Sequence, residues 1–262
     1  MRSIDFELTL IGSAQVFHWV KTGTGYVAAV NGRIMRHDDE TPEAKHYFDD
    51  GRDYSRLADD CVKYEQASCA VRRLRGLRVL NQPAWEALVA FILSANNNVK
   101  RIRDLVNALC LHYGEEIKSD GTALYAFPSP ETLSRQDPQK LKRVVTCGYR
   151  AEYLVETAKT VWEGFDLNAL RDMPIEKARK ELMRLKGVGP KVADCVLLFG
   201  CGHADAFPVD VWVKRLMESW FGVTGSPQKI SDKAREMLGP NCGLIQQSLF
   251  HAARCGLIKV RI

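Results

Sequence analysis

The sequence lacks the cysteine spacing of a metal site. Its eight cysteines stand at positions 61, 69, 110, 147, 195, 201, 242 and 255, and no Cys-x-x-Cys pair occurs among them. This excludes the usual zinc and closely spaced iron–sulfur motifs and favours a set of reduced thiols. We therefore expect a cytoplasmic protein without a bound metal.

Long hydrophobic runs are also missing. The longest apolar run, residues 192–201, is about half the length of a membrane span and contains Asp194. The first ten residues, MRSIDFELTL, lack the uninterrupted apolar stretch of a secretory signal. We expect no contact with a membrane.

The composition is that of an ordinary globular protein. The 262 residues are 46% hydrophobic and 26% charged, with a net charge of +5. This length allows a sizeable core, and the mild positive charge suits an anionic partner such as nucleic acid. The densest basic cluster, RRLRGLR at 72–78, is either a solvated face or a phosphate-facing patch.

The periodicity of the sequence changes once along the chain. The first fifty residues alternate in short runs, which predicts antiparallel strands, and the Asn-Gly pair at 31–32 predicts a hairpin turn. The runs are FELTLIG, VFHWV, GYVAAVNG, RIMRH and KHYFDD. From about residue 52 the apolar period is helical. The predicted helices are 54–65, 69–76, 82–94, 98–113, 137–145, 150–164, 174–186, 190–200, 209–221, 230–238 and 243–255.

These two parts predict an α+β fold. We expect a small antiparallel-sheet domain with flanking helices at 1–80, followed by a larger all-helical domain at 81–262. The helical domain contains the most informative turn of the chain.

Residues 186–195, KGVGPKVADC, join two of the predicted helices. Gly187, Val188 and Gly189 form a short turn, and Pro190 takes a favoured first-turn position of a nearly all-apolar second helix. Such a helix-hairpin-helix directs backbone amides outward, ready for a phosphate oxygen. For the turn taken alone, an ordinary αα-corner is the alternative.

Lys191 lies in the first turn of that second helix. A cation there opposes the helix dipole, which costs about 0.3–1 kcal/mol, and partial burial disfavours the charged amine further. Both effects favour the neutral amine that a nucleophile or Schiff-base former needs. A lysine that extends to solvent is the plain alternative.

Asp210 follows the segment FPV and precedes a helical run, so capping that helix explains it sufficiently. If the chain turns back after the second hairpin helix, however, the carboxylate lies beside the Lys191 amine. Such a pair can cleave an N-glycosidic bond, because the amine attacks the anomeric carbon while the carboxylate stabilises positive charge on the sugar.

The Gly-Val-Gly hairpin, Lys191 and Asp210 together resemble the base-excision DNA glycosylase superfamily. The segments GVGPKVADC and FPVDVW are similar in particular to those of 8-oxoguanine DNA glycosylase/AP lyases, and the resemblance covers almost the whole chain. It implies double-stranded DNA with an oxidised guanine as partner, excision of 8-oxoguanine opposite cytosine, and β-elimination through a lysine Schiff base. It also implies a monomer that requires no cofactor, with a monovalent cation at the hairpin when DNA is bound.

Two further segments extend the resemblance to the base opposite the lesion. SANNNVKRIR is similar to the family's triple-asparagine segment, which implies that Asn96 and Arg101 contact the cytosine. CGYRAEY is similar to the segment that supplies a second cytosine-reading arginine, Arg150, and an inserted wedge, Tyr149. Amide and guanidinium groups suit a Watson–Crick edge, and an aromatic ring can fill a vacated stack. Taken singly, the two segments also fit a helix N-cap and a helix start.

The resemblance places the damaged base between Cys195 and Phe250. In NCGLIQQSLFHAA it gives Gln246 hydrogen bonds to the flipped base, and Phe250 follows four residues later on the same helix face. Cys195 shares a face with Lys191 for the same reason. A Phe and a Cys on apolar faces are otherwise ordinary core residues.

Two positions depart from the family pattern. SAQVFHW resembles the segment whose backbone carbonyl detects the N7–H of 8-oxoguanine, but this chain has Ala14 where many relatives have glycine. Because alanine disfavours positive φ, we expect a different backbone path there and altered discrimination from guanine. Trp212 stands where better-known relatives have histidine, and we expect the loss of a phosphate contact or a supporting hydrogen bond.

Two other functions stay open from the sequence. A glycosylase of the same superfamily for another damaged base is the nearest. Some members of the superfamily hold an iron–sulfur cluster through closely spaced cysteines, but Cys242 and Cys255 stand too far apart for this, and we expect no such cluster. Members that act on alkylated bases typically lack the lysine that this chain has at 191. A noncatalytic DNA-binding protein would use the hairpin for phosphate contacts alone, and it requires neither Lys191 nor Asp210.

Overall fold

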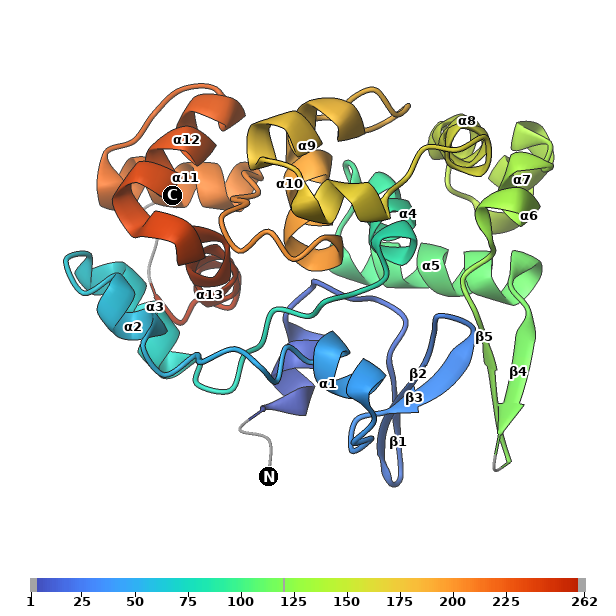
Figure 1. Cartoon of the computed structure of the whole chain (residues 1–262), viewed down its shortest axis with the longest axis horizontal. Coiled ribbons are helices and arrows are strands. Elements are labelled where there is room, and N and C mark those ends of the chain that lie inside the picture. The colour runs from blue at the N-terminus through green and yellow to red at the C-terminus, as the bar shows by residue number, and fades with distance from the viewer. Residues whose placement is uncertain (1–3, 120, 259–262) are drawn as a thin grey trace.

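The computed structural model describes residues 4–119 and 121–258. A small antiparallel sheet lies along one side of the molecule and helices form most of the remainder (Figure 1). The predicted α+β class is therefore confirmed. The strands are β1 Val20–Thr22, β2 Gly25–Val30, β3 Arg33–Arg36, β4 Glu116–Ser119 and β5 Thr122–Tyr125. The α-helices are α1 Pro42–Tyr47, α2 Leu57–Asp60, α3 Glu65–Arg73, α4 Ala84–Ser94, α5 Val99–Tyr113, α6 Pro130–Ser134, α7 Pro138–Val145, α8 Arg150–Trp162, α9 Ile175–Leu182, α10 Pro190–Gly200, α11 Val211–Phe221, α12 Pro227–Leu238 and α13 Cys242–Arg254.

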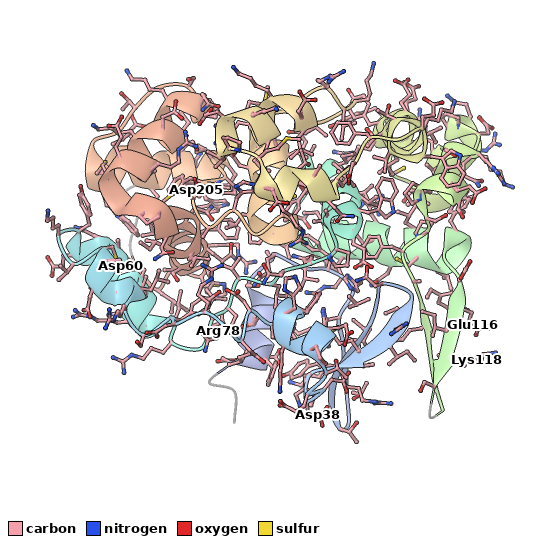
Figure 2. All side chains as sticks on the ribbon, in the orientation of Figure 1. Asp38, Asp60, Arg78, Glu116, Lys118 and Asp205 are labelled. Atoms are coloured by element: carbon pink, nitrogen blue, oxygen red, sulfur yellow. The ribbon has the colours of Figure 1, made fainter. Side chains whose placement is uncertain are left out.

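The sheet has the order β1-β2-β3 and contains the predicted hairpin. Val30 of β2 pairs with Arg33 of β3, so Asn31 and Gly32 are the two turn residues. Their φ angles are 49° and 71°, the positive values that an Asn-Gly hairpin turn requires. A second hairpin, β4–β5, projects from the end of α5, and its Glu116 and Lys118 side chains lie at the edge of the molecule (Figure 2).

Two of the predicted strands are helical. FELTLIG forms a π-helix, Glu7–Gly12, and KHYFDD falls at the end of α1 and beyond it. The start of α1 explains the second difference, because the Thr41 side chain accepts a hydrogen bond from the Ala44 amide and Pro42 occupies the first turn. VFHWV is neither helix nor strand except at its last residue, Val20, which pairs within the sheet.

Most of the predicted helices are confirmed. The bounds of α4, α5, α8 and α10 agree closely with the predicted ranges 82–94, 98–113, 150–164 and 190–200. The prediction is poorest at 54–65, where only α2 is α-helical, and the β4–β5 hairpin and α6 were not predicted.

The buried residues form two clusters. The smaller one joins the inner face of the sheet to α1, and its largest members are Trp19, Tyr47 and Phe48. The larger one fills the helical body and includes residues of α2 and α3, which pack near α13. A boundary at residue 80 stays a prediction, because part of the first eighty residues contributes to the helical core. No helix among the described residues is long and apolar enough to cross a membrane.

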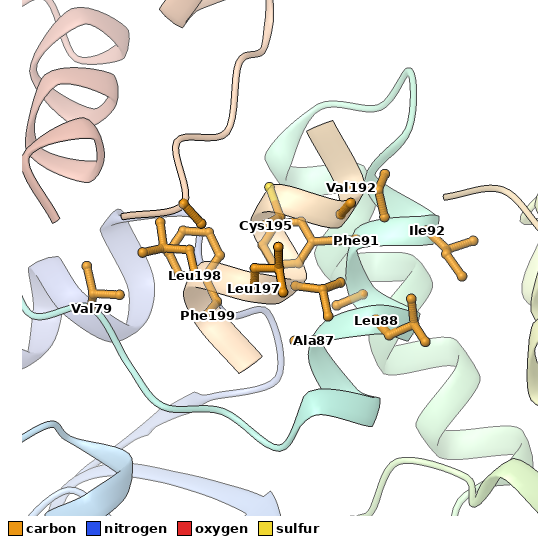
Figure 3. Packing of buried hydrophobic residues seen from close by; sticks show 14 of the residues in the cluster. Val79, Ala87, Leu88, Phe91, Ile92, Val192, Cys195, Leu197, Leu198 and Phe199 are labelled. Atoms are coloured by element: carbon orange, nitrogen blue, oxygen red, sulfur yellow. The ribbon is translucent and has the colours of Figure 1, made fainter. Parts of the chain in front are cut away.

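Helices α4 and α10 form the centre of the larger cluster and lie against one another (Figure 3). A Cβ on Gly200 would lie 3.0 Å from the Cα of Ala84, so this glycine permits the close approach. The rings of Phe91 and Phe199 stack at 5.3 Å. This contact sets the first turn of α10 beside the last turn of α4, and the candidate site lies there.

Candidate functional site

The turn between α9 and α10 has the helix-hairpin-helix geometry that the sequence predicts. Gly187 has a φ of 80°, and a Cβ at this position would lie 2.5 Å from the ring of Tyr153 on α8. Thr157 of the same helix donates a hydrogen bond to the Lys186 carbonyl at 2.9 Å. The turn therefore packs against α8. Glycine is required at 187 because φ is positive and because a Cβ would clash with the Tyr153 ring.

The start of α10 presents uncapped amides. Its N-cap residue is Gly189, and no side chain accepts a hydrogen bond from its first amides. In the described part of the chain, the amides of Gly189 and Lys191 have no hydrogen-bond acceptor. The Val188 amide, in contrast, donates to the Leu185 carbonyl at 3.2 Å and is not among these free amides. Free amides at a helix N-terminus favour an anion.

The Lys191 amine is held at the end of α4. Its Nζ lies 3.0 Å from Ser94 Oγ, and Ser94 in turn donates to the Phe91 carbonyl at 2.7 Å. Nζ also lies 5.0 Å from the ring centre of Phe91. Lys191 is half-buried, so the alternative of a lysine extended freely into solvent does not describe this structure.

Asp210 is the N-cap of α11, as its sequence position predicts. Its Oδ1 accepts a hydrogen bond from the Val213 amide at 2.8 Å. Among the described residues no ion pair within 4.0 Å joins this carboxylate to Lys191, but both side chains line the same cavity. Capping uses one carboxylate oxygen, and the side chain shares the cavity with the amine.

The cavity has a volume of about 990 Å³ and lies between the start of α10 and the ends of α4 and α13. It adjoins a recess where all four predicted base-pocket residues meet. The recess is lined by Ala14, Phe91, Lys191, Cys195, Phe199, Pro208, Asp210, Gln246, Gln247 and Phe250. Segments from both ends of the chain thus meet beside the Lys191 amine.

Cys195 and Gln246 give the recess its chemical character. Burial raises the pKa of the Cys195 thiol to about 12, even though the nearby Lys191 charge acts to lower it. The thiol therefore stays neutral and acts as an apolar wall. Gln246 donates to the Pro208 carbonyl at 3.0 Å, while its buried Oε1 has no partner among the described residues. An unpaired buried acceptor in a recess calls for a ligand that donates a hydrogen bond.

Ala14 corrects one prediction directly. Its φ is 59°, so the alanine adopts the left-handed conformation that was expected to be avoided. This conformation costs about 1–2 kcal/mol for a residue with a Cβ, and the surrounding structure must supply that energy. The backbone path at Ala14 is therefore the one that a glycine would take.

The predicted opposite-base residues gather beyond the mouth of the cavity. Arg150 is buried, donates to the Ala95 and Cys147 carbonyls, and lies 4.4 Å from the ring centre of Tyr149. Asn96, with a φ of 51°, donates to the Tyr149 hydroxyl at 3.4 Å.

Arg101 lies beside this group. It donates to the carbonyl and hydroxyl of Thr146 at 2.8 and 2.7 Å. Tyr149 itself is 45% exposed and packs edge-on against Tyr153, at 5.4 Å between ring centres. Tyr153 also lies beside Gly187 of the hairpin. The predicted wedge, Tyr149, and the hairpin therefore both pack against the same side chain.

Several site residues escaped the sequence reasoning. Ser94 is the first residue of the segment SANNNVKRIR, at the end of an apolar helix, and this position is the one signal that pointed to it. Phe91 and Gln247 had none, because in the sequence Phe91 resembles any core residue and Gln247 any polar helix residue. Trp212, in contrast, was singled out in the sequence as a departure from the family pattern; it lines the cavity and is 38% exposed.

A helix-hairpin-helix whose second helix begins with a lysine that shares a cavity with an aspartate is the arrangement expected of a base-excision DNA-repair protein. The matching protein-family model is "HhH-GPD superfamily base excision DNA repair protein", over residues 89–240. This match covers more than half of the chain. The protein therefore belongs to the HhH-GPD superfamily.

Within that superfamily, the chain is similar in sequence to N-glycosylase/DNA lyases. An N-glycosylase/DNA lyase of Saccharomyces cerevisiae is 36% identical over 170 residues, which are 60% of this chain and 45% of the yeast protein. A probable N-glycosylase/DNA lyase of Methanothermobacter thermautotrophicus is 34% identical over 70% of this chain and 66% of its own length. The chain thus spans less than two thirds of either protein.

A solved structure is similar over nearly the whole chain. It is the 8-oxoguanine glycosylase/lyase of Clostridium acetobutylicum in complex with double-stranded DNA containing cytosine opposite 8-oxoguanine. The TM-score is 0.89 at 29% identity, covering 97% of this chain and 93% of that one.

Proposed function

We propose that the protein is a bifunctional DNA glycosylase and AP lyase that excises 8-oxoguanine opposite cytosine. The observation that carries the proposal is the recess itself, where an anchored lysine amine, a carboxylate and an unpaired amide oxygen face one space. The similarity to N-glycosylase/DNA lyases and to the clostridial enzyme supports it.

The base-recognition step uses the recess as a pocket for a flipped nucleobase. The ring lies between Cys195 and Phe250, and the Gln246 Oε1 accepts a hydrogen bond from the Watson–Crick edge of the purine. The Ala14 carbonyl accepts the N7–H that 8-oxoguanine has and guanine lacks. A purine that leaves either acceptor unpaired is disfavoured by the desolvation of that group.

The chemical step uses Lys191 and Asp210. The Lys191 nitrogen in its neutral form attacks C1′, the bond from C1′ to the base breaks, and the departing base takes up a proton. Asp210 stabilises the positive charge that develops on the sugar. Opening of the sugar ring gives a Schiff base, loss of a C2′ proton expels the 3′ phosphate, and water releases the enzyme. All groups used belong to the chain, so the proposal requires no cofactor.

The opposite strand is read by the residues around Tyr149. Tyr149 fills the space of the extruded base, while Asn96, Arg101 and Arg150 contact the cytosine edge. The guanidinium groups of Arg101 and Arg150 donate hydrogen bonds to the backbone carbonyls of Thr146 and Ala95, which orients both groups.

The hairpin holds the DNA backbone. The free amides of Gly189 and Lys191 contact a phosphate, and the remaining carbonyls of the 187–189 turn suit a monovalent cation when DNA is bound. Among the described residues, no group of three or more His, Cys, Asp or Glu side chains is arranged to hold a metal ion. We further propose that the protein acts as a monomer in the cytoplasm, at the nucleoid in a prokaryote; its eight free cysteines support a reducing compartment.

A panel of duplexes tests the proposed substrate. Each duplex carries one lesion, either 8-oxoguanine, an oxidised pyrimidine or an alkylated purine, and the released base is measured under single-turnover conditions. We expect release of 8-oxoguanine, fastest opposite cytosine. Preferred release of another lesion would replace the substrate, and salt-sensitive binding without release of any base would indicate a noncatalytic DNA-binding protein.

Replacing Asp210 with asparagine separates its two roles. The amide retains an oxygen that can cap α11, so DNA affinity should be kept while turnover falls. If affinity falls as far as turnover, Asp210 acts only as a cap.

A further inference from the structure

In the segment before the sheet, the backbone carbonyls of residues 11–13 each accept a hydrogen bond from a distant side chain. The Ile11 carbonyl accepts a hydrogen bond from Arg103 of α5 at 3.0 Å, and the Gly12 carbonyl accepts one from Arg254 of α13. The Ser13 carbonyl accepts one from Gln247 of α13 at 2.7 Å. Side chains from two helices distant in sequence therefore fix the chain as it enters the recess.

The residue after Ala14 is fixed still more completely. The Gln15 carbonyl accepts a hydrogen bond from Gln82 at 2.8 Å, and the Gln15 side chain bonds to the Arg78 carbonyl and the Leu80 amide at 2.7 and 2.9 Å. Gln15, Gln82 and Gln247 are each 2% exposed or less. Their hydrogen bonds are thus shielded from competition by water.

Ala14 lies between these two fixed points. In the run 11–15 its carbonyl is the only one that accepts no hydrogen bond from the described residues, and Ala14 lines the recess. Its φ of 59° is unfavourable for alanine, so this conformation persists only because its surroundings impose it. The hydrogen bonds at Ser13 and Gln15 fix the peptide planes on either side, and this sets the direction of the Ala14 carbonyl.

Gln82 also connects this segment to the helix that carries the lysine. Its amide donates to the Phe199 carbonyl near the end of α10 at 2.8 Å, while its side chain holds the Gln15 carbonyl. The acceptor at Ala14 and the amine at Lys191 are consequently placed on one rigid frame.

We propose that Gln247 and Gln82 are positioning residues for damage recognition, which clamp the Ser13 and Gln15 carbonyls and so hold the Ala14 carbonyl in the direction that accepts a hydrogen bond from the lesion. This inference rests on the proposed function, because the lesion it serves is a purine with a donor at N7. It also explains how the chain tolerates alanine at a position that favours glycine. The glutamines supply the restraint that the residue's own preference does not.

The test compares three variants with the wild-type protein. Gln247→Met removes the donor with little change in side-chain volume, and Ser248→Ala, the neighbouring buried residue on α13, is the control. The double variant Gln247→Met, Ala14→Gly restores a residue that adopts positive φ freely. Two reactions are measured: release of 8-oxoguanine from its duplex with cytosine, and nicking of a duplex with a preformed abasic site, which needs no base recognition.

We expect Gln247→Met to slow release of 8-oxoguanine about tenfold or more, because a small displacement of an orienting group has that effect on a rate. Nicking of the abasic duplex should stay within about twofold of wild type. The added Ala14→Gly should recover much of the lost release. The Ser248→Ala control should match the wild type in both reactions.

Two kinetic results would overturn the inference. One is a fall in abasic-site nicking as large as the fall in base release, which would indicate a general structural role for Gln247. The other is a double variant slower than Gln247→Met alone. Should Gln247→Met not fold, Gln82→Met removes the clamp at Gln15 and carries the same expectations.

A crystal structure of the Gln247→Met variant tests, without any substrate, whether Gln247 holds the backbone conformation of Ala14. The inference requires Ala14 to leave positive φ in that variant, and an unchanged φ near 59° would refute it. If the wild-type protein nicks abasic DNA but releases no 8-oxoguanine, the proposed substrate is wrong, and the φ of Ala14 in this variant still decides whether the clamp exists.

Discussion

Replacing Glu86 with glutamine is expected to remove most of the loss of stability that we predict for the protein as the pH rises from 6.5 to 8.5. Glu86 on α4 accepts a hydrogen bond from the Asn31 amide at 3.0 Å, and its Oε2 lies 3.7 Å from the His18 Nε2. Both of these side-chain atoms are buried, and neither has a hydrogen-bond partner among the described residues. The group therefore joins the sheet to the helical body as a neutral acid.

The two pKa shifts determine whether stability rises or falls with pH. Burial raises the pKa of Glu86 from 4.5 to about 8, so its contribution is complete below pH 4.5 and is lost as the pH rises through 8. Burial lowers the pKa of His18 from 6.5 to about 4, so its contribution is present above pH 6.5 and is lost as the pH falls through 4. Above pH 6.5 the Glu86 effect dominates.

The size of the effect follows from linkage. Between pH 6.5 and 8.5 the unfolded chain has an ionised Glu86 throughout, while the folded protein retains the proton over most of the interval. At 1.36 kcal/mol per pKa unit, the free energy of unfolding should fall by about 2 kcal/mol over this interval. Burial also raises the pKa of Asp194, but only to about 6, so most of its change lies below this window.

Urea unfolding at pH 6.5, 7.5 and 8.5 measures the effect. Wild type and an exposed control, Glu218→Gln, should lose stability across this interval, whereas Glu86→Gln should lose only the smaller part that arises near pH 8.5 from buried thiols such as Cys195, whose pKa burial raises to about 12. If Glu86→Gln falls in parallel with the wild type, the carboxyl is not the source of the pH dependence and the reasoning fails.

Three other perturbations have defined outcomes. Gly187→Ala should lower the free energy of unfolding by about 2–3 kcal/mol in urea, because a Cβ at φ 80° meets the Tyr153 ring. Arg179 and Asp194 form a buried ion pair at 2.6 Å, so Arg179→Met should cost about 3–5 kcal/mol, and adding Asp194→Leu should recover most of that loss. Ser94→Ala removes the hydrogen bond to the lysine amine and should slow base release about tenfold without weakening DNA binding, as measured by single-turnover kinetics and fluorescence anisotropy.

The helical part of the fold was predictable because its signals are local. Helix α10 begins at Pro190 and ends at Gly200, as the apolar run with its flanking glycines predicts. The Asn-Gly turn likewise determined the β2–β3 hairpin from two residues. Such elements need no knowledge of what packs against them.

The errors lie where packing decides the local structure. FELTLIG alternates like a strand, yet it folds as a π-helix whose last carbonyls are captured by side chains of α5 and α13. The helix predicted over 54–65 ends at Asp60, and Tyr64 leaves the helical region with a ψ of 89°. In the sequence, nothing distinguishes these segments from regular ones.

The candidate site likewise contains residues that local sequence signals predicted and residues whose contacts depend on the whole fold. Lys191 and Asp210 were predicted to share a site because one turn and one cap signal place them, and both line the recess. The partner of the lysine, Ser94, is 97 residues away, and Gln247 lies 234 residues from the carbonyl that it holds. Contacts over such separations depend on the whole fold. The left-handed Ala14 is the clearest case, since local preference predicted the opposite.

The central claim is that the Lys191 amine forms the covalent bond to DNA. The direct measurement is borohydride reduction with an 8-oxoguanine duplex, followed by mass spectrometry of the cross-linked peptide. Lys214 is the matched control, because it lines the same cavity from α11. The account predicts an adduct on Lys191 that disappears in Lys191→Gln and persists in Lys214→Gln. An adduct on Lys214, or one undiminished in Lys191→Gln, would contradict it.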